Sequence, residues 1–287
     1  MDLTPKRLVD GLLFPEGPRW HDGRLWISDM EAQKVITVDL QGRSEVIVEL
    51  DDRPSGLGWL PDGSMLIISA LQRKLLRLDS GALSVYADLA GYGERMLNDM
   101  VVDGQGRAYV DAYDLPETPG ALPGKIVLVL PDGSSRLATD DVVGPNGSGI
   151  TADGKTFVVC ETVGSAVRAF DIAADGALVN GRPYARLDNK RPDGMCLDAE
   201  GAVWVASIGT GEFLRVLEGG KVTDRIAYDT KTIACMLGGE EMRTLFLLNA
   251  TVSPGSAREA LAAGRESPEL KGWIDTVEVD VPGAGWP

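Results

Sequence analysis

The stretch SGLGWLPDGSMLIIS, residues 55–69, combines a short apolar run, an Asp-Gly turn and a second apolar run. This arrangement is typical of two antiparallel strands joined by a tight turn. Five further stretches share it: EGPRWHDGRLWISD, NDMVVDGQGRAYVDA, NGSGITADGKTFVVC, DGMCLDAEGAVWVAS and ACMLGGEEMRTLFLL, which begin at Glu16, Asn98, Asn146, Asp193 and Ala234. One strand-turn-strand unit is therefore repeated six times along the chain.

The six copies keep a nearly constant register. In four of them the turn glycine lies eight residues after the first residue: Ser55 to Gly63, Asn98 to Gly106, Asn146 to Gly154 and Asp193 to Gly201. The first copy is one residue shorter, and the last is degenerate in its turn. Successive copies start 39, 43, 48, 47 and 41 residues apart, which leaves room for a second hairpin in each period.

Such second hairpins are present, for example KVITVDLQGRSEVIVE (34–49) and KLLRLDSGALSVYAD (74–88). Four strands in roughly 40 to 50 residues are the signature of a β-propeller blade. The sequence therefore predicts an all-β, six-bladed β-propeller with four-stranded antiparallel blades around a central channel, as one domain over residues 1–287. We expect residues 273–281 in the sixth blade and a strand near residues 7–9 that closes the ring. An irregular β-sandwich is the alternative.

Composition limits the function classes. The net charge of -15 disfavours nucleic acid and anionic membranes as partners. No stretch approaches the roughly 18 apolar residues that span a bilayer, and the first residues do not resemble a signal peptide. The three cysteines are widely spaced without a CxxC pair, so we expect buried thiols and no sulfur-ligated metal. These features predict a cytoplasmic protein, either a monomer or a small homo-oligomer.

The first strand of a propeller blade lines the channel, so the first residues of the six copies should lie at one height around it. We call these the ring residues: Glu16, Ser55, Asn98, Asn146, Asp193 and Ala234. The two acids would repel each other unless a cation lay between them. Carboxylate and amide oxygens fit Ca²⁺ best, with Mg²⁺, Mn²⁺, Zn²⁺ and Fe²⁺ as alternatives. Taken singly, each Asn or Asp could instead be a turn residue.

Five of the stretches also resemble, in order, the gluconolactonase / regucalcin (senescence marker protein) / luciferin-regenerating-enzyme family: EGPRW, LNDMVVDGQGRAYV, GPNGSGITADGKTFVV, RPDGMCLDAEGAVWVA and GGEEMRTLFLL. The resemblance extends from residue 14 to about residue 281. It implies a divalent ion held by Glu16, Asn146 and Asp193, with Asn98 beside it in contact with substrate or ion. It also implies lactone hydrolysis with Asp193 as the base.

The sequence departs from this family at an arginine. Members that act on sugar lactones commonly carry Arg-x-Asn-Asp, whose arginine grips substrate oxygens, but here the run is RMLND, residues 95–99. Leu97 beside the asparagine leaves room for a less polar substrate. We expect Arg95, Tyr113 and Asp114 to bind substrate. The segments 111–124 and 249–272 are long enough to be lids, and the second contains a predicted helix at 256–263.

For a lactone, the ion would polarise the carbonyl and activate a water, with Asp193 as general base. A serine nucleophile is disfavoured, because residues 147–149 lack the GxSxG pattern and His21 lies in a turn far from Glu16. Three alternatives stay open: a phosphotriesterase-like hydrolase using the same site, a calcium- or ligand-binding propeller without turnover, and a metal-free strictosidine-synthase-like propeller. Two acids facing one axis count against the last.

Overall fold

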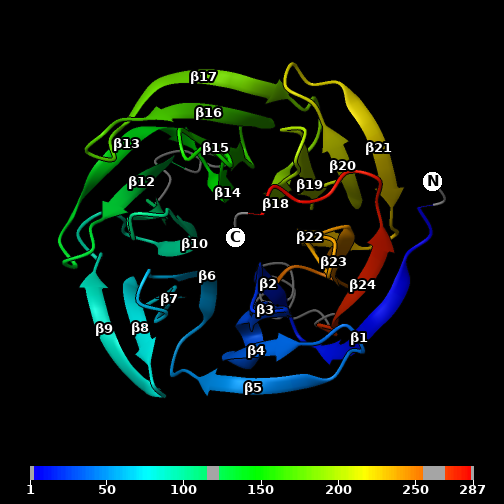
Figure 1. Cartoon of the computed structure of the whole chain (residues 1–287), viewed down its shortest axis with the longest axis horizontal. Coiled ribbons are helices and arrows are strands. Elements are labelled where there is room, and N and C mark those ends of the chain that lie inside the picture. Colours follow the sequence, from blue (N-terminus) through cyan, green and yellow to red (C-terminus); the bar gives the residue numbers. More distant parts are fainter. Residues whose placement is uncertain (1–2, 115–122, 255–268, 286–287) are drawn as a thin grey trace, which may run out of the picture.

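The computed structural model describes residues 3–114, 123–254 and 269–285. Its strands form six four-stranded antiparallel sheets, arranged as a ring around a central axis (Figure 1). The predicted six-bladed β-propeller is confirmed. Among the described residues, no helix is both long and apolar enough to cross a membrane.

Blades 1 to 5 each use four consecutive strands, ordered from the channel outward. Blade 1 contains β2 (Pro15–His21), β3 (Arg24–Asp29), β4 (Lys34–Val38) and β5 (Ser44–Glu49), with a 3-10 turn at Met30–Ala32. Blade 2 contains β6 (Pro54–Trp59), β7 (Met65–Ser69), β8 (Lys74–Asp79) and β9 (Ala82–Asp88). Blade 3 contains β10 (Met96–Val102), β11 (Ala108–Tyr113), β12 (Pro123–Val129) and β13 (Ser135–Val143). Blade 4 contains β14 (Pro145–Ile150), β15 (Thr156–Glu161), β16 (Ala166–Ile172) and β17 (Leu178–Arg186). Blade 5 contains β18 (Pro192–Leu197), β19 (Val203–Ser207), β20 (Glu212–Val216) and β21 (Val222–Ala227).

Blade 6 is built from both ends of the chain. It contains β22 (Lys231–Gly238), β23 (Thr244–Ala250) and β24 (Gly272–Glu278), and its outermost strand is β1 (Lys6–Leu12). β1 pairs antiparallel with β24, with Lys6 opposite Thr276 and Leu12 opposite Gly272. An N-terminal strand therefore closes the ring, as predicted.

The six inner strands are irregular at the ring residues. Each has a shift in its pairing register there, between Glu16 and Arg19, Pro54 and Leu57, Leu97 and Met100, Pro145 and Ser148, Pro192 and Met195, and Thr232 and Ala234. A β-bulge of this kind re-aims side chains and is common beside active sites. The repetition of the bulge in all six blades places the ring residues equivalently around the channel.

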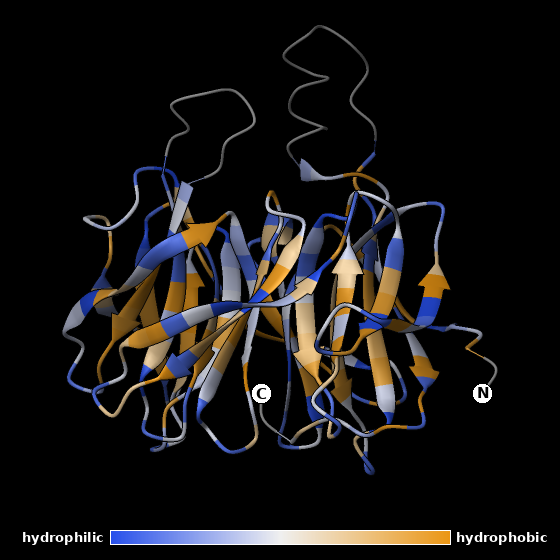
Figure 2. Ribbon diagram, turned by 90° about the horizontal axis from the view of Figure 1, so that it is seen from above, coloured by the Kyte–Doolittle hydropathy of each residue, from blue (hydrophilic) through white to orange (hydrophobic). Residues whose placement is uncertain are grey.

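Close packing of the inner strands depends on the glycine that follows a ring residue. A Cβ added to Gly17 would lie 2.6 Å from the Ser55 carbonyl oxygen, and one added to Gly147 would lie 2.6 Å from that of Asp193. The apolar core lies between neighbouring blades, and polar residues mark the turns (Figure 2).

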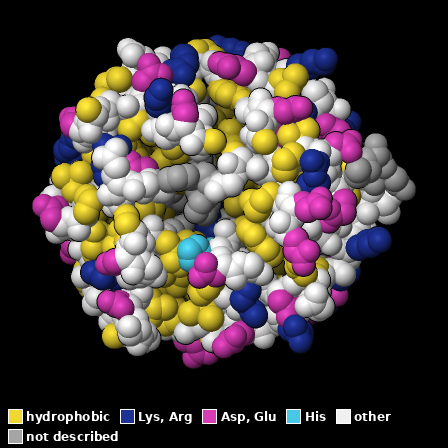
Figure 3. Space-filling model, in the orientation of Figure 1, with side chains coloured by type: hydrophobic (Ala, Val, Ile, Leu, Met, Phe, Trp, Pro, Cys, Tyr) yellow, Lys and Arg dark blue, Asp and Glu magenta, His cyan; other side chains and the backbone are white. Residues whose placement is uncertain are grey.

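The single histidine lies at the end of the ring that carries the Asp-Gly turns. Inner strands start near the ring residues and run to the Asp-Gly turns on the opposite face. Figure 3 shows the single histidine, His21, among apolar side chains, with acidic side chains scattered over that face. His21 stacks on Trp59 with ring centroids 4.1 Å apart, at the end of β2 away from Glu16. This position agrees with its exclusion from the candidate site.

Candidate active site and metal centre

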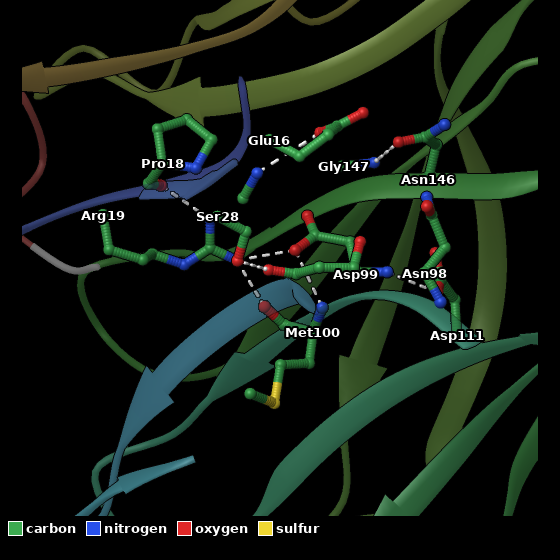
Figure 4. A network of polar contacts seen from close by, with 12 residues as sticks. Glu16, Pro18, Arg19, Ser28, Asn98, Asp99, Met100, Asp111, Asn146 and Gly147 are labelled. Atoms are coloured by element: carbon green, nitrogen blue, oxygen red, sulfur yellow. Dashed lines mark hydrogen bonds and ion pairs between the residues drawn. The ribbon is translucent and has the colours of Figure 1, made fainter. Parts of the chain in front are cut away.

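Asn146 and Asp193 lie on neighbouring blades and are joined by a hydrogen bond between their side chains. The Asn146 carbonyl oxygen accepts the backbone N–H of Gly147 at 2.8 Å (Figure 4), which leaves the amide nitrogen to donate the hydrogen bond to Asp193. That oxygen keeps a second lone pair for a cation. Asp193 is 4% exposed, so its carboxylate is held in a buried position at the start of β18.

The electrostatics of Asp193 suit proton transfer near neutral pH. Burial, together with the charge of Asp99, raises the pKa of Asp193 to about 7, and the hydrogen bond from Asn146 and the charge of Arg191 partly offset that rise. A general base is most effective when its pKa lies near the working pH. Asp193 can therefore both accept a proton and contribute an oxygen ligand.

Glu16 faces the same acids from blade 1. Burial, followed by the charges of Asp193, Asp99 and Asp111, raises the pKa of Glu16 well above its ordinary value. One carboxylate oxygen accepts the backbone N–H of Gly17 at 3.2 Å. Among the described residues no lysine or arginine forms an ion pair with Glu16, so its charge lacks a protein partner that would neutralise it.

Asn98 is oriented by Tyr113, which lies on the next strand of the same blade. The Tyr113 hydroxyl donates to the carbonyl oxygen of Pro145 and accepts the Asn98 side-chain N–H at 3.3 Å. The Asn98 amide nitrogen is thus turned toward β11, and its carbonyl oxygen is left without a partner among the described residues. Tyr113 therefore lies at the site, where its hydroxyl fixes the orientation of the Asn98 amide.

A buried ion pair lies beside these residues and links blade 1 to blade 3. An Arg19 Nη2 nitrogen is 3.0 Å from an Asp99 carboxylate oxygen, which also accepts the backbone N–H of Met100 at 2.8 Å (Figure 4). The ion pair lies beside Gly56 of blade 2, where an added Cβ would lie 2.8 Å from an Asp99 carboxylate oxygen. Asp99 therefore braces the backbone beside Asn98. The repeat pattern did not identify Arg19 as part of the site, and its only distinguishing feature in the sequence is a charge within an apolar strand.

Asp111 is a further acid of the site that the sequence analysis did not single out. It lies on β11 opposite the β10 bulge, and one carboxylate oxygen accepts the backbone N–H of Asn98 at 2.9 Å and of Asp99 at 2.6 Å. Its other oxygen is buried and has no hydrogen-bond partner among the described residues. Burial and then the charge of Asp99 raise the pKa of Asp111 well above its ordinary value. The available signal was a lone acid within the apolar run AYVDAY.

Arg95 and Asp114 lie outside this cluster. Arg95 is exposed, and its backbone N–H donates to the Tyr113 carbonyl oxygen at 2.9 Å. Asp114 is ion-paired with Lys125 at 2.5 Å. Leu97 is 0% exposed and packs in the core between blades 2 and 3. The expectation that Leu97 makes the pocket less polar is therefore wrong, because its side chain belongs to the core. The predicted helix at 256–263 and residues 115–122 of the first candidate lid lie outside the described residues.

The donor set fits a hard divalent ion. Glu16 and Asp193 offer carboxylate oxygens, Asn146 and Asn98 offer amide oxygens, and Asp111 has an unpartnered buried oxygen nearby. Such oxygen donors are the ligands of Ca²⁺ rather than of a soft metal. No three His, Cys, Asp or Glu side chains of the described residues form a metal-ligating group, so the ligand set needs the amide of Asn146.

Comparisons with known proteins agree with this architecture. Residues 14–251 match the family model described as the SMP-30/Gluconolactonase/LRE-like region. Regucalcin of Gallus gallus is 27% identical over 259 residues, covering 86% of each chain. The L-arabinolactonase of Azospirillum brasilense is 27% identical over 254 residues, covering 86% of this chain and 83% of that one. The crystal structure of a calcium-binding protein, regucalcin, from Agrobacterium tumefaciens superposes with a TM-score of 0.78 at 20% identity, covering 99% and 97% of the two chains.

Proposed function

This chain belongs to the SMP-30/Gluconolactonase/LRE-like family, and on that premise we propose that it is a lactone hydrolase that works with a bound divalent ion, Ca²⁺ being the best suited. The observation that carries the proposal is the buried pair of Asp193 and Glu16, which combines a carboxyl of pKa about 7 with a second acid that has no cationic partner among the described residues. The activity named for the L-arabinolactonase relative supports the reaction class.

Glu16, Asn146 and Asp193 would hold the ion, and the Asn98 carbonyl oxygen would face the ion or the substrate. When bound, the ion supplies a Lewis acid that draws electron density from the ester carbonyl. Tyr113 and Asp111 hold Asn98 in place through the hydrogen bonds described above. Arg19 and Asp99 brace the backbone behind it.

Asp193 is proposed to take the proton of the attacking water on a carboxylate oxygen. The proton then leaves Asp193 for the ring oxygen as the ester bond breaks, so the base is restored in each turnover. Burial raises the pKa of Asp193 to about 7 in the metal-free protein, and a bound cation would lower it, so that Asp193 would be ionised and able to accept a proton at neutral pH. The product is a hydroxy acid.

A lactone panel tests the proposal. Purified protein is freed of metal with EDTA and assayed with a pH indicator on sugar and alkyl lactones, with Ca²⁺, Mn²⁺, Mg²⁺, Zn²⁺ or Fe²⁺ added back, and with paraoxon as a phosphotriester. Turnover of a lactone that is lost with EDTA and restored by an ion is expected. Paraoxon turnover with no lactone turnover would favour the phosphotriesterase, and ion binding without any turnover would favour the binding propeller. The single-domain organisation, the cytoplasmic location, and the monomer or small homo-oligomer stay predictions.

A further inference from the structure

Basic residues gather just above the ring residues, at the end of the channel that holds the site. The twelve positions two and three residues before the ring residues include five lysines or arginines and one acid, Asp52, whereas the whole chain has 28 basic and 43 acidic residues. The excess of positive charge is therefore specific to these positions. We call the five the basic collar: Arg53, Arg95, Lys190, Arg191 and Lys231.

The members of the collar occupy equivalent places in four blades. Each lies at, or immediately before, the first residues of an inner strand, on the face away from the Asp-Gly turns. A strand rises about 3.3 Å per residue, so a residue two positions before a ring residue starts about 7 Å above it. A lysine or arginine side chain is long enough to cover that distance. The collar residues therefore lie at the end of the ring where the inner strands begin, which is the end nearest to Asp193.

Two members are already neutralised and three are not. Arg53 is ion-paired with Glu31 at 3.0 Å, and Lys190 is ion-paired with Glu212. The side chains of Arg95, Arg191 and Lys231 have no hydrogen-bond or ion-pair partner among the described residues, although the chain carries an excess of acids. Unpaired cations at the mouth of an otherwise acidic channel are suited to bind an anionic group of a ligand.

Arg191 is the member tied most directly to the site. It lies two residues before Asp193, its side chain is exposed, and its charge acts on the Asp193 carboxyl. Its stem packs against Gly209, where an added Cβ would lie 3.0 Å from Arg191 Cγ. A guanidinium held by its stem but free at its tip can form two parallel hydrogen bonds to a carboxylate.

We propose that the substrate of this site is a lactone that carries a carboxylate outside the reacting ring, and that Arg191, with Arg95 and Lys231, binds that carboxylate. The proposal rests on the lactone hydrolysis proposed above and narrows its substrate class. The collar would also draw an anionic substrate toward a protein whose net charge of -15 otherwise repels it. The hydroxy acid formed by such a lactone is a dicarboxylate.

The test compares two lactones that differ by one group. D-glucono-1,4-lactone and D-glucaro-1,4-lactone share a five-membered ring, and the first ends in CH₂OH where the second ends in a carboxylate. The measured quantity is the ratio of kcat/KM for the glucaro lactone to kcat/KM for the glucono lactone. The variants are Arg191→Gln, Arg191→Lys and Arg186→Gln, the last being an exposed arginine at the end of the outer strand β17.

The wild-type protein should favour the carboxylate-bearing lactone by about tenfold or more, as expected for one charge-assisted contact. Arg191→Gln should remove most of that ratio, mainly through KM, whereas Arg191→Lys should keep much of it and the Arg186→Gln control all of it. The ratio should also fall as salt is raised. A wild-type ratio near one, or an equal loss on both lactones in Arg191→Gln, would overturn the proposal.

A binding readout separates this proposal from the proposed function. D-glucarate and D-gluconate are titrated calorimetrically into wild-type protein and Arg191→Gln. If neither lactone is hydrolysed but D-glucarate binds more tightly than D-gluconate in an Arg191-dependent way, the lactonase proposal fails and the anion site stands. If lactones are hydrolysed and D-glucarate shows no such preference, the anion site fails alone.

Discussion

At the scale of single residues, Glu16 and Asp193 occupy equivalent positions in blades 1 and 5 but differ in their surroundings. Asp193 accepts a hydrogen bond from Asn146 and lies near the charge of Arg191, whereas Glu16 faces three acids. The first environment suits a group that takes and returns a proton. The second suits a group that is ionised only beside a cation. The two residues should therefore respond differently to loss of their charge.

Asp193→Asn keeps an oxygen for a hard cation but removes the proton acceptor. We expect kcat to fall by roughly 10² to 10⁴, the range for loss of a general base. Glu16→Gln also keeps an oxygen and removes no base, so it should weaken metal affinity and recover turnover when metal is added in excess. Steady-state kinetics over a Ca²⁺ titration distinguishes the two. If excess metal restores Asp193→Asn to wild-type turnover, Asp193 is a ligand only, and Asp111, whose second carboxylate oxygen has no partner among the described residues, is the next acid to test.

Tyr113 should act through Asn98. Tyr113→Phe removes the hydroxyl that accepts the Asn98 amide N–H, so the amide loses its fixed orientation. We expect kcat/KM to fall several-fold, with roughly 1 kcal/mol of coupling in a double-mutant cycle with Asn98→Ala. Kinetics of the two single variants and the double variant supply the cycle. Strictly additive losses would mean that Tyr113 contributes independently of Asn98.

The repeat register predicted which residues of the site come from equivalent strand positions, and it could not predict the others. Glu16, Asn98, Asn146 and Asp193 share one position in the repeat, so aligning the copies brings them together. Asp111 lies on a second strand in a position that other blades fill differently, and Arg19 reaches the site across another blade. Their roles depend on side-chain direction and length, which spacing does not encode.

At the scale of the elements, the inner strands are held together where side chains are absent. Gly56 of blade 2 lies beside the ion pair between Arg19 and Asp99, and a Cβ there would lie 2.6 Å from the Met100 backbone nitrogen. Because the obstacle is backbone, it cannot move aside as a flexible side chain would. The bulges that aim the ring residues therefore depend on close strand contact.

Gly56→Ala should destabilise the fold by about 1 to 3 kcal/mol through overpacking, and should lower activity by displacing Asp99. Gly91→Ala is the matched control, because an added Cβ at Gly91 meets nothing within 4 Å. Urea unfolding of both variants and of the wild type measures the difference. Equal unfolding midpoints for the two variants would show that the inner strands tolerate a wider spacing.

Alternation of apolar runs and Asp-Gly turns was sufficient to predict the strands and their grouping into blades. The bulges were not predictable in the same way. A bulge places two residues opposite one without changing the spacing of ring residue and turn glycine, so the repeat has the same length with or without it. The strand order could therefore be predicted from the sequence, but the directions in which the ring side chains point could not.

At the scale of the whole molecule, the propeller gathers buried acids from three blades at one end of its channel. Glu16, Asp99, Asp111 and Asp193 interact electrostatically, and the ion pair with Arg19 neutralises one of them. β1 closes the ring on β24 through hydrogen bonds and not through a covalent link. Repulsion within the channel therefore acts directly against ring closure, and a bound cation should relieve it.

Metal-free protein should accordingly lose stability as the pH rises. A carboxyl whose pKa is higher in the folded than in the unfolded state favours folding at pH values below its unfolded pKa of about 4. That contribution is lost as the pH rises through the folded pKa, which is about 7 for Asp193 and well above the ordinary value for Glu16 and Asp111. EDTA-treated protein should therefore melt at a lower temperature at pH 8 than at pH 5.

Ca²⁺ at a hundred times its Kd should restore about 2.7 kcal/mol of folding stability at pH 8, because it binds the folded state with the acids ionised. The Asp193→Asn variant is the control, since without the titrating acid the difference between pH 5 and pH 8 should shrink. Melting temperatures that are equal at the two pH values and unchanged by Ca²⁺ would show that repulsion between these carboxylates does not limit the stability of the metal-free protein.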